Sequence, residues 1–133
     1  MPIKPVDSDA SPILRTLAMP ADTNPNGDVF GGWIMSQMDI AGGILAKETA
    51  RSRVVTVAVD SFKFLKPVNV GDVVCCYGRV LRIGKTSIAI ALEVWVKSAL
   101  AETEEEWPRF KVTEAIFTYV AIDAEGKKWA IKN

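Results

Sequence analysis

The chain has 133 residues, 49% of them hydrophobic, and its 16 basic and 16 acidic side chains give a formal net charge of zero. This size and balance predict one globular domain and favour neither nucleic acid nor a membrane surface as a partner. No apolar run reaches the roughly 18 residues that a membrane-spanning helix needs. Residues 1–12 carry prolines and small polar groups, so we expect a flexible N-terminal arm there. They contain no apolar signal core, which favours a cytoplasmic location.

The chain contains no histidine. This absence excludes Ser-His and Cys-His catalytic pairs and almost all catalytic zinc sites. Acid–base chemistry near neutral pH must then come from Asp, Glu, Lys, Tyr or Cys. The only two cysteines, Cys75 and Cys76, are adjacent and would point to opposite faces of a strand, so we expect no disulfide between them.

In chain order, a short strand is predicted over 13–19, followed by a turn-rich loop over 20–28. A helix is predicted over 31–50, where good helix formers surround Gly42 and Gly43. The pattern is apolar on nearly all sides, which is typical of a buried helix. The side that carries Asp39 has mostly small residues, and a second subunit is its natural cover, so we predict a homodimer. The residues of this side are Gly32, Met35, Gly43, Ala46 and Ala50.

Strands are predicted over 54–65, 73–83, 86–96, 109–122 and, as a short last one, 128–131. In the first of these the apolar phase changes near Ser61, which indicates either a bulge or a strand buried on both faces. The acidic segment 97–108 is expected to be a solvated loop at a hairpin tip. The order of elements predicts an α+β fold, a single domain over 13–133 in which a curved antiparallel sheet of five to six strands wraps around one long central helix.

Three motifs follow one another in the middle of the chain. An N-x-x-G-x-x-F-G-G loop and a mid-helix Asp lie in ADTNPNGDVFGGWIMSQMDIAGGILA, and an F-x-K-P-V-x-V-G-D segment lies in VVTVAVDSFKFLKPVNVGDVV. With these motifs the sequence resembles the hotdog-fold acyl-CoA thioesterases, in particular the YciA type, from about residue 14 to 123. The resemblance implies dimers whose sheets join edge to edge, and often a hexamer of three dimers. It also implies an active site at the dimer interface, where Asp39 faces Asn24 of the other subunit and Gly31 and Gly32 begin the helix.

The residues themselves allow a thioester-hydrolysing site and also simpler roles. Asp39 could serve as general base or attack a thioester directly, or it could be a partly buried Asp paired with a basic residue or a serine across the interface. The unpaired amides at Gly31 and Gly32 could form an oxyanion hole, or the glycines could only make a tight junction. Asn24 could orient water or the thioester carbonyl, or only form a turn.

Coenzyme A carries phosphates, so an enzyme without net charge needs a local cationic patch to bind it. The candidates for binding coenzyme A lie around one turn and in the segments before it, and each could instead be a solvated strand end. They are Lys63, Lys66, Arg79, Arg82, Gly84, Lys85, Thr86 and Ser87.

The sequence thus predicts an acyl-CoA thioester hydrolase that releases free CoA and a carboxylic acid. We expect no metal and no cofactor, since coenzyme A is part of the substrate. The alternative is a non-catalytic hotdog module that binds or senses acyl-CoA. A hydroxyacyl dehydratase of the same fold is disfavoured, because such relatives usually rely on histidine.

Overall fold

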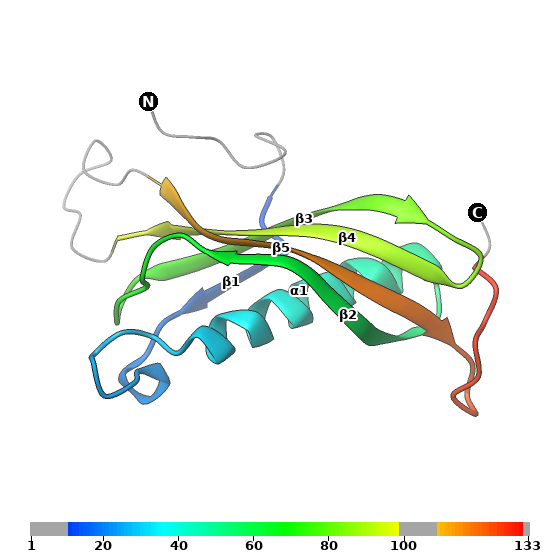
Figure 1. Ribbon diagram of the computed structural model, residues 1–133, viewed down its shortest axis with the longest axis horizontal. Coiled ribbons are helices and arrows are strands. Elements are labelled where there is room, and N and C mark those ends of the chain that lie inside the picture. Colours follow the sequence, from blue (N-terminus) through cyan, green and yellow to red (C-terminus); the bar gives the residue numbers. More distant parts are fainter. Residues whose placement is uncertain (1–10, 99–108, 132–133) are drawn as a thin grey trace.

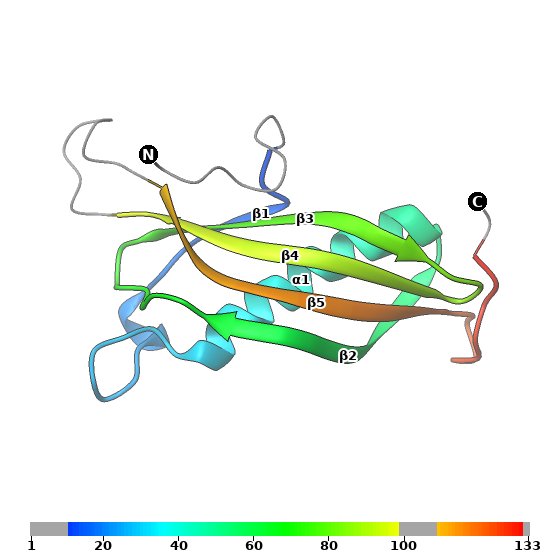
Figure 2. The same ribbon diagram turned by 45° about the horizontal axis from the view of Figure 1, so that its top comes forward.

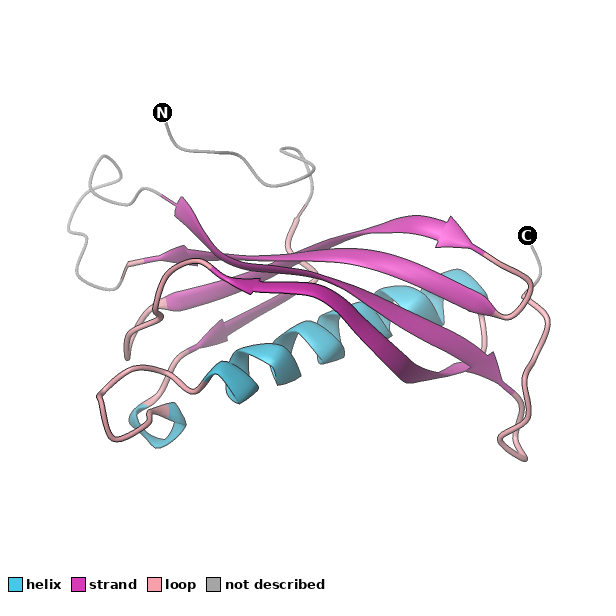
Figure 3. Ribbon diagram, in the orientation of Figure 1, coloured by secondary structure: helices cyan, strands magenta, loops and turns pink. Residues whose placement is uncertain are grey.

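The computed structural model describes residues 11–98 and 109–131. Most of the predicted arm (1–12) and most of the acidic loop (97–108) therefore lie outside the described residues. One long helix packs against a five-stranded sheet whose paired strands are all antiparallel (Figures 1 and 3). In chain order the elements are β1 (Leu14–Leu17), the 3-10 helix η1 (Pro20–Asp22), α1 (Gly31–Ala50), β2 (Arg53–Phe64), β3 (Val73–Ile83), β4 (Ser87–Lys97) and β5 (Arg109–Ile122).

The sheet has the order β1-β3-β4-β5-β2 and curves along one side of α1 (Figure 2). Its helix-facing side supplies the core, and the alternation predicted for β4 is confirmed. The β4 residues buried there are Ile88, Ile90, Leu92, Val94 and Val96. Because α1 turns one stripe of side chains toward these residues, burial is concentrated on that stripe. It consists of Ile34, Met38, Ala41, Gly42, Ala46 and Ala50.

The prediction that α1 is buried on nearly all sides is wrong for the single chain. Met35, Ile40 and Ile44 are exposed, Ile40 to 49%. Ala46 and Ala50, which we had placed on the side needing a second cover, are buried within the chain. The sheet covers only one side of α1, so the other side is left uncovered in the single chain. That side carries the bulky Met35, Ile40 and Ile44 and is not mostly small.

β2 is an edge strand of the sheet, and several of its apolar side chains are exposed. Val55, Val57 and Val59 are all exposed, Val57 to 54%. The bulge predicted near Ser61 is confirmed, because the register with β5 shifts between Asp60 and Lys63 and Ser61 has φ 54°. This edge therefore combines free backbone pairing groups with apolar side chains, which favours pairing with another chain.

The last predicted strand, 128–131, is wrong. Beyond the turn at 123–127 the chain makes only an isolated bridge between Ile122 and Lys128. The amide of Trp129 donates to Ala121 O at 2.8 Å, and the amide of Ile131 donates to Lys85 O at 2.8 Å. The segment thus crosses from β5 to the β3–β4 turn instead of extending one ladder.

Cys75 and Cys76 lie on opposite faces of β3, as predicted. Cys76 belongs to the core beneath α1, whereas Cys75 packs with Tyr77 and Trp95 on the other face. Both cysteines are free. Within residues 11–98 and 109–131, no helix combines the length and the apolarity that a bilayer crossing needs.

Candidate active site

Asp39 lies in the middle of α1, half-buried beside the sheet. Its Oδ1 accepts a hydrogen bond from Thr56 Oγ1 of β2 at 2.6 Å and another from the Tyr119 hydroxyl of β5 at 3.0 Å. Within the single chain both partners are neutral hydroxyls, and neither belongs to a basic residue or a serine. Among the described residues no group donates to Oδ2. One carboxylate oxygen is therefore fixed and the other is available to a ligand.

Tyr119 is buried to 1% exposure, and its hydroxyl also lies 3.1 Å from the main-chain oxygen of Asp39. Burial, and then the neighbouring Asp39 carboxylate, raises the pKa of this hydroxyl above its usual range. The hydroxyl therefore stays protonated and acts as a donor. Our sequence reasoning missed both Thr56 and Tyr119. The available signal was a tyrosine on the core face of β5, since a buried tyrosine hydroxyl usually needs a partner.

Gly42 gives Tyr119 its room. A Cβ at this position would overlap the Tyr119 hydroxyl oxygen and would lie 2.9 Å from Leu92 Cδ1. At Gly43 the nearest atom to such a Cβ is Tyr119 Cε2, at an ordinary 4.0 Å. The glycine pair that weakens the helix pattern thus contains one position where only glycine allows the tyrosine to reach Asp39.

The start of α1 presents free backbone donors. The amides of Trp33 and Ile34 both donate to Phe30 O, at 3.1 and 3.3 Å, and no acceptor among the described residues takes the amides of Gly31 and Gly32. A Cβ at Gly32 would meet nothing within 4 Å. Since the first amides of a helix carry the positive end of its dipole, this end can receive a developing negative charge.

At Gly31 a neighbouring side chain leaves no space for a Cβ. A Cβ there would lie 2.8 Å from Cζ of Phe64, the last residue of β2. The ring therefore packs directly over the first turn of the helix. Of the two predicted glycines, Gly31 makes a tight junction and Gly32 faces open space.

Asn24 organises the loop before the helix. Its Oδ1 accepts from the amides of Asn26 and Asp28, at 2.9 and 3.2 Å. The simpler reading of Asn24 as a turn former is therefore correct for its oxygen, while its side-chain nitrogen has no partner among the described residues. Asn24 lines a cavity of about 390 Å³ together with Gly31, Phe64 and Lys66.

Asp39 does not line this cavity. It follows Gly31 by eight residues, which at about 1.5 Å per residue separates the two by about 12 Å along the helix axis. One carbonyl group cannot contact both at once. A single chain therefore does not bring Asp39 together with Asn24 and the helix start.

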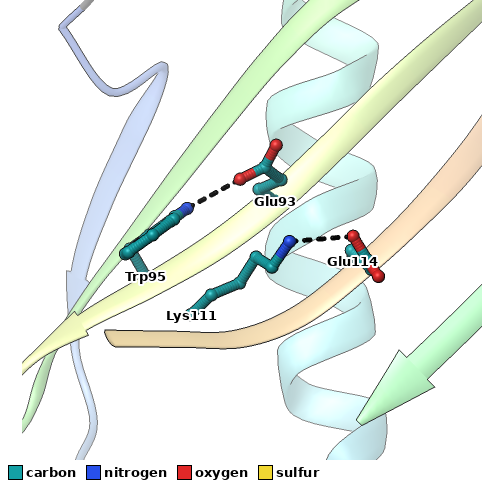
Figure 4. Close-up of polar contacts among 4 residues, drawn as sticks. All are labelled: Glu93, Trp95, Lys111 and Glu114. Atoms are coloured by element: carbon teal, nitrogen blue, oxygen red, sulfur yellow. Dashed lines mark hydrogen bonds and ion pairs between the residues drawn. The ribbon is translucent and has the colours of Figure 1, made fainter. Parts of the chain in front are cut away.

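The candidates for binding coenzyme A fall into three places. Lys66 lines the cavity at the helix start. Lys63 and Arg79 line a separate cavity of about 330 Å³ beside Glu93 and Glu114, and Figure 4 shows these two carboxylates on the side of the sheet away from α1. There Glu93 accepts from Trp95 Nε1 at 2.8 Å, and Glu114 pairs with Lys111 at 2.9 Å.

The remaining candidates surround the β3–β4 turn, which lies at the opposite end of the molecule from the start of α1 (Figure 1). They are Arg82, Gly84, Lys85, Thr86 and Ser87. The eleven residues of β3 extend the chain by about 36 Å at about 3.3 Å each. For this reason the single chain does not form one cationic patch from all these residues.

Within that turn, the amide of Gly84 is not free to bind a phosphate. Its N–H donates to Ser87 O at 2.8 Å. Arg82 and Lys85 are exposed and make no ion pair with any described residue. The turn can therefore offer its cationic side chains to a phosphate, but not the Gly84 amide. Across the described ranges, no group of three or more His, Cys, Asp or Glu side chains is arranged to hold a metal ion.

Comparison with known proteins agrees with this architecture. The family model described as Thioesterase superfamily matches residues 26–101. The acyl-CoA thioester hydrolase YciA of Escherichia coli is 62% identical over 119 residues, which cover 90% of this chain and 89% of that protein.

Two solved structures are similar in both sequence and fold. A hexameric thioesterase from Yersinia pestis has 58% identity and a TM-score of 0.86, over 94% of this chain and 98% of that one. The Asp-to-Ala mutant of a hexameric broad-specificity acyl-coenzyme A thioesterase has 57% identity and a TM-score of 0.87, over 94% and 88%. The chain belongs to the thioesterase superfamily, among the hotdog-fold acyl-CoA thioesterases of the YciA type.

Proposed function

We propose that this chain hydrolyses acyl-CoA thioesters to free CoA and a carboxylic acid, at active sites that two copies of the chain build together. The observation that carries the proposal is the state of Asp39. Two hydroxyls hold its Oδ1, and its Oδ2 is free among the described residues. A module that only binds or senses acyl-CoA has no use for such a carboxylate, so the hydrolase is favoured over the sensor.

Two copies are needed because Asp39 and the helix start lie about 12 Å apart along α1. The second copy would cover the exposed side of the helix, where Met35, Ile40 and Ile44 lie. It would pair with the open β2 edge, so that the two sheets become continuous. Asp39 of one copy would then face Asn24, Gly31 and Gly32 of the other. Since both structural relatives are hexameric, we propose that three such dimers assemble further.

In the proposed reaction, Asp39 Oδ2 accepts a proton from water while the water oxygen attacks the thioester carbonyl carbon. The carbonyl oxygen takes the electron pair and accepts hydrogen bonds from the amides of Gly31 and Gly32, each worth about 3 kcal/mol in the transition state. The C–S bond then breaks, and the Asp39 carboxyl returns its proton to the leaving CoA thiolate. The Asn24 amide orients the water or the carbonyl.

The alternative course uses the same carboxylate. Oδ2 attacks the carbonyl carbon itself, CoA leaves, and water hydrolyses the resulting mixed anhydride. Neither course involves a cofactor beyond the coenzyme A of the substrate. We also propose a cytoplasmic location, which the two free cysteines support.

For the phosphates of coenzyme A we propose the exposed cations Arg82 and Lys85, with the hydroxyls of Thr86 and Ser87, and Lys66 at the helix-start cavity. Lys63 and Arg79 share their cavity with two carboxylates, which reduces its attraction for an anion.

A complementation experiment tests the composite site. Asp39→Asn removes the base with little change in shape. Asn24→Asp keeps the oxygen that organises the loop but removes the amide nitrogen. Each variant alone should lose most of its turnover, measured as CoA release with a thiol reagent. When the two are co-expressed with different tags, half of the dimers are mixed and each mixed dimer has one intact site, so about one quarter of wild-type activity should return.

The outcomes separate the parts of the proposal. A fully active Asp39→Asn variant would refute the role of Asp39. Two inactive variants that show no recovery in mixed dimers would refute the site shared between copies. Thermal unfolding of each variant serves as the control for folding.

A further inference from the structure

We propose that Tyr119 is a positioning residue for Asp39, whose hydroxyl fixes the carboxylate so that Oδ2 faces the uncovered side of α1. This inference rests on the proposed function, in which Asp39 is the reacting carboxylate. Tyr119 itself does not touch the substrate, because it is buried beneath the helix.

The hydrogen-bond geometry supports this role. The Tyr119 hydroxyl lies 3.0 Å from Oδ1 and 3.1 Å from the main-chain oxygen of the same residue, Asp39. A hydroxyl within reach of both atoms ties the side chain to its own backbone and so restricts its rotation. Thr56 contacts the same Oδ1 from β2, at 2.6 Å. The carboxylate is thus held from two strands, and its rotation must break these contacts.

The tyrosine is itself held in place. Its ring stacks with that of Phe117, with centroids 6.3 Å apart. Gly42 leaves space for the hydroxyl, and any side chain at that position would overlap it. The Tyr119 hydroxyl lies between β5 and the turn of α1 next to Asp39. It therefore cannot move away without repacking the core.

The protonation state also fits the role. The charged group that acts on the hydroxyl from α1 is Asp39, and β2 contributes the neutral Thr56. On the β4 side the nearby group is the apolar Leu92. Burial and then the Asp39 charge raise the pKa of Tyr119, so it remains a donor throughout the pH range of an assay. A constant donor to Oδ1 holds the carboxylate in one orientation.

The other tyrosine of the chain, Tyr77, provides a matched control. It is also buried, and its hydroxyl accepts a hydrogen bond from Arg109 at 3.0 Å, on the face of the sheet away from α1. Tyr119→Phe and Tyr77→Phe therefore each remove one hydroxyl group from a buried ring. For both variants we would measure kcat and KM for one acyl-CoA, and thermal unfolding.

For Tyr119→Phe we expect a fall in kcat of about tenfold with KM changed less than about twofold, since the lost contact acts on the reacting group rather than on substrate binding. Tyr77→Phe should match the wild type in kcat and KM.

Each other result overturns the inference. A wild-type kcat in Tyr119→Phe would refute the role of Tyr119 even if Asp39→Asn is inactive. A fall in kcat with an equally large change in KM, or one shared by Tyr77→Phe, would show a merely structural effect. If Asp39→Asn keeps full activity, the proposed role of Asp39 fails, and that failure is recognised independently of Tyr119.

Discussion

The two adjacent glycines of α1 allow a stability prediction with an internal control. Replacing glycine by alanine inside a helix stabilises it by about 1 kcal/mol. At Gly43 the added Cβ would make only an ordinary contact at 4.0 Å, so Gly43→Ala should gain most of that amount. At Gly42 the added Cβ would overlap the Tyr119 hydroxyl, and overpacking of a core costs about 1–3 kcal/mol. Gly42→Ala should therefore end between neutral and about 2 kcal/mol less stable than wild type.

The measurement is urea unfolding of the wild type and both variants, followed by circular dichroism. All three must be compared at one protein concentration, because assembly stabilises the folded chain by mass action. The difference between the two variants should be about 1–3 kcal/mol, with Gly43→Ala the more stable. If Gly42→Ala proves as stable as Gly43→Ala, the close packing of Tyr119 against the helix is wrong, and the steric reason for a glycine at position 42 fails with it.

Two further predictions concern the cysteines and the coenzyme. Burial, and then the neighbouring Cys75, raises the pKa of Cys76 to about 12, and both cysteine side chains are buried. The native protein should therefore show almost no reactive thiol toward a disulfide reagent at about pH 8, and two per chain after unfolding. Rapid labelling of the native chain would contradict this packing. The double charge reversal Arg82→Glu and Lys85→Glu should raise KM for acyl-CoA at least about tenfold but leave KM for a truncated thioester without the nucleotide nearly unchanged. Arg15→Glu, on the exposed side of β1, is the control, and equal effects of the double reversal on both substrates would rule out this phosphate site.

Much of the fold could be predicted from local pattern. The helix over 31–50 and the strands over 73–83 and 109–122 have the bounds that the structure gives. Their signals, helix formers without proline and β-branched alternation between turn residues, act over a few neighbouring positions. The phase change at Ser61 likewise marks the bulge in β2. Among the predicted strands, 128–131 was misjudged, because its short apolar pattern does not reveal that its backbone bonds are divided between β5 and the β3–β4 turn.

The site could be predicted only in part. The motifs singled out Asp39, Asn24, Gly31 and Gly32. The structure gives a packing reason for Gly31 and hydrogen-bond partners for Asp39 and Asn24, while the catalytic roles of all four stay predictions. The partners of Asp39 could not be found in this way. Tyr119 is 80 positions away in the sequence, and nothing in the pattern of β5 indicates which helical turn its hydroxyl meets.

The sequence by itself therefore determined the elements, the family and the chemical groups available for hydrolysis in a chain without histidine. The tertiary structure decided which side of α1 is covered, why Gly42 has no side chain, and that Asp39 and the helix start cannot serve one carbonyl within one copy. The physical reason is the distance along the sequence over which each kind of interaction acts. Helix and strand preferences arise from neighbours along the chain. The hydrogen bonds on Asp39 and the uncovered apolar side of the helix depend instead on how the open sheet packs against α1.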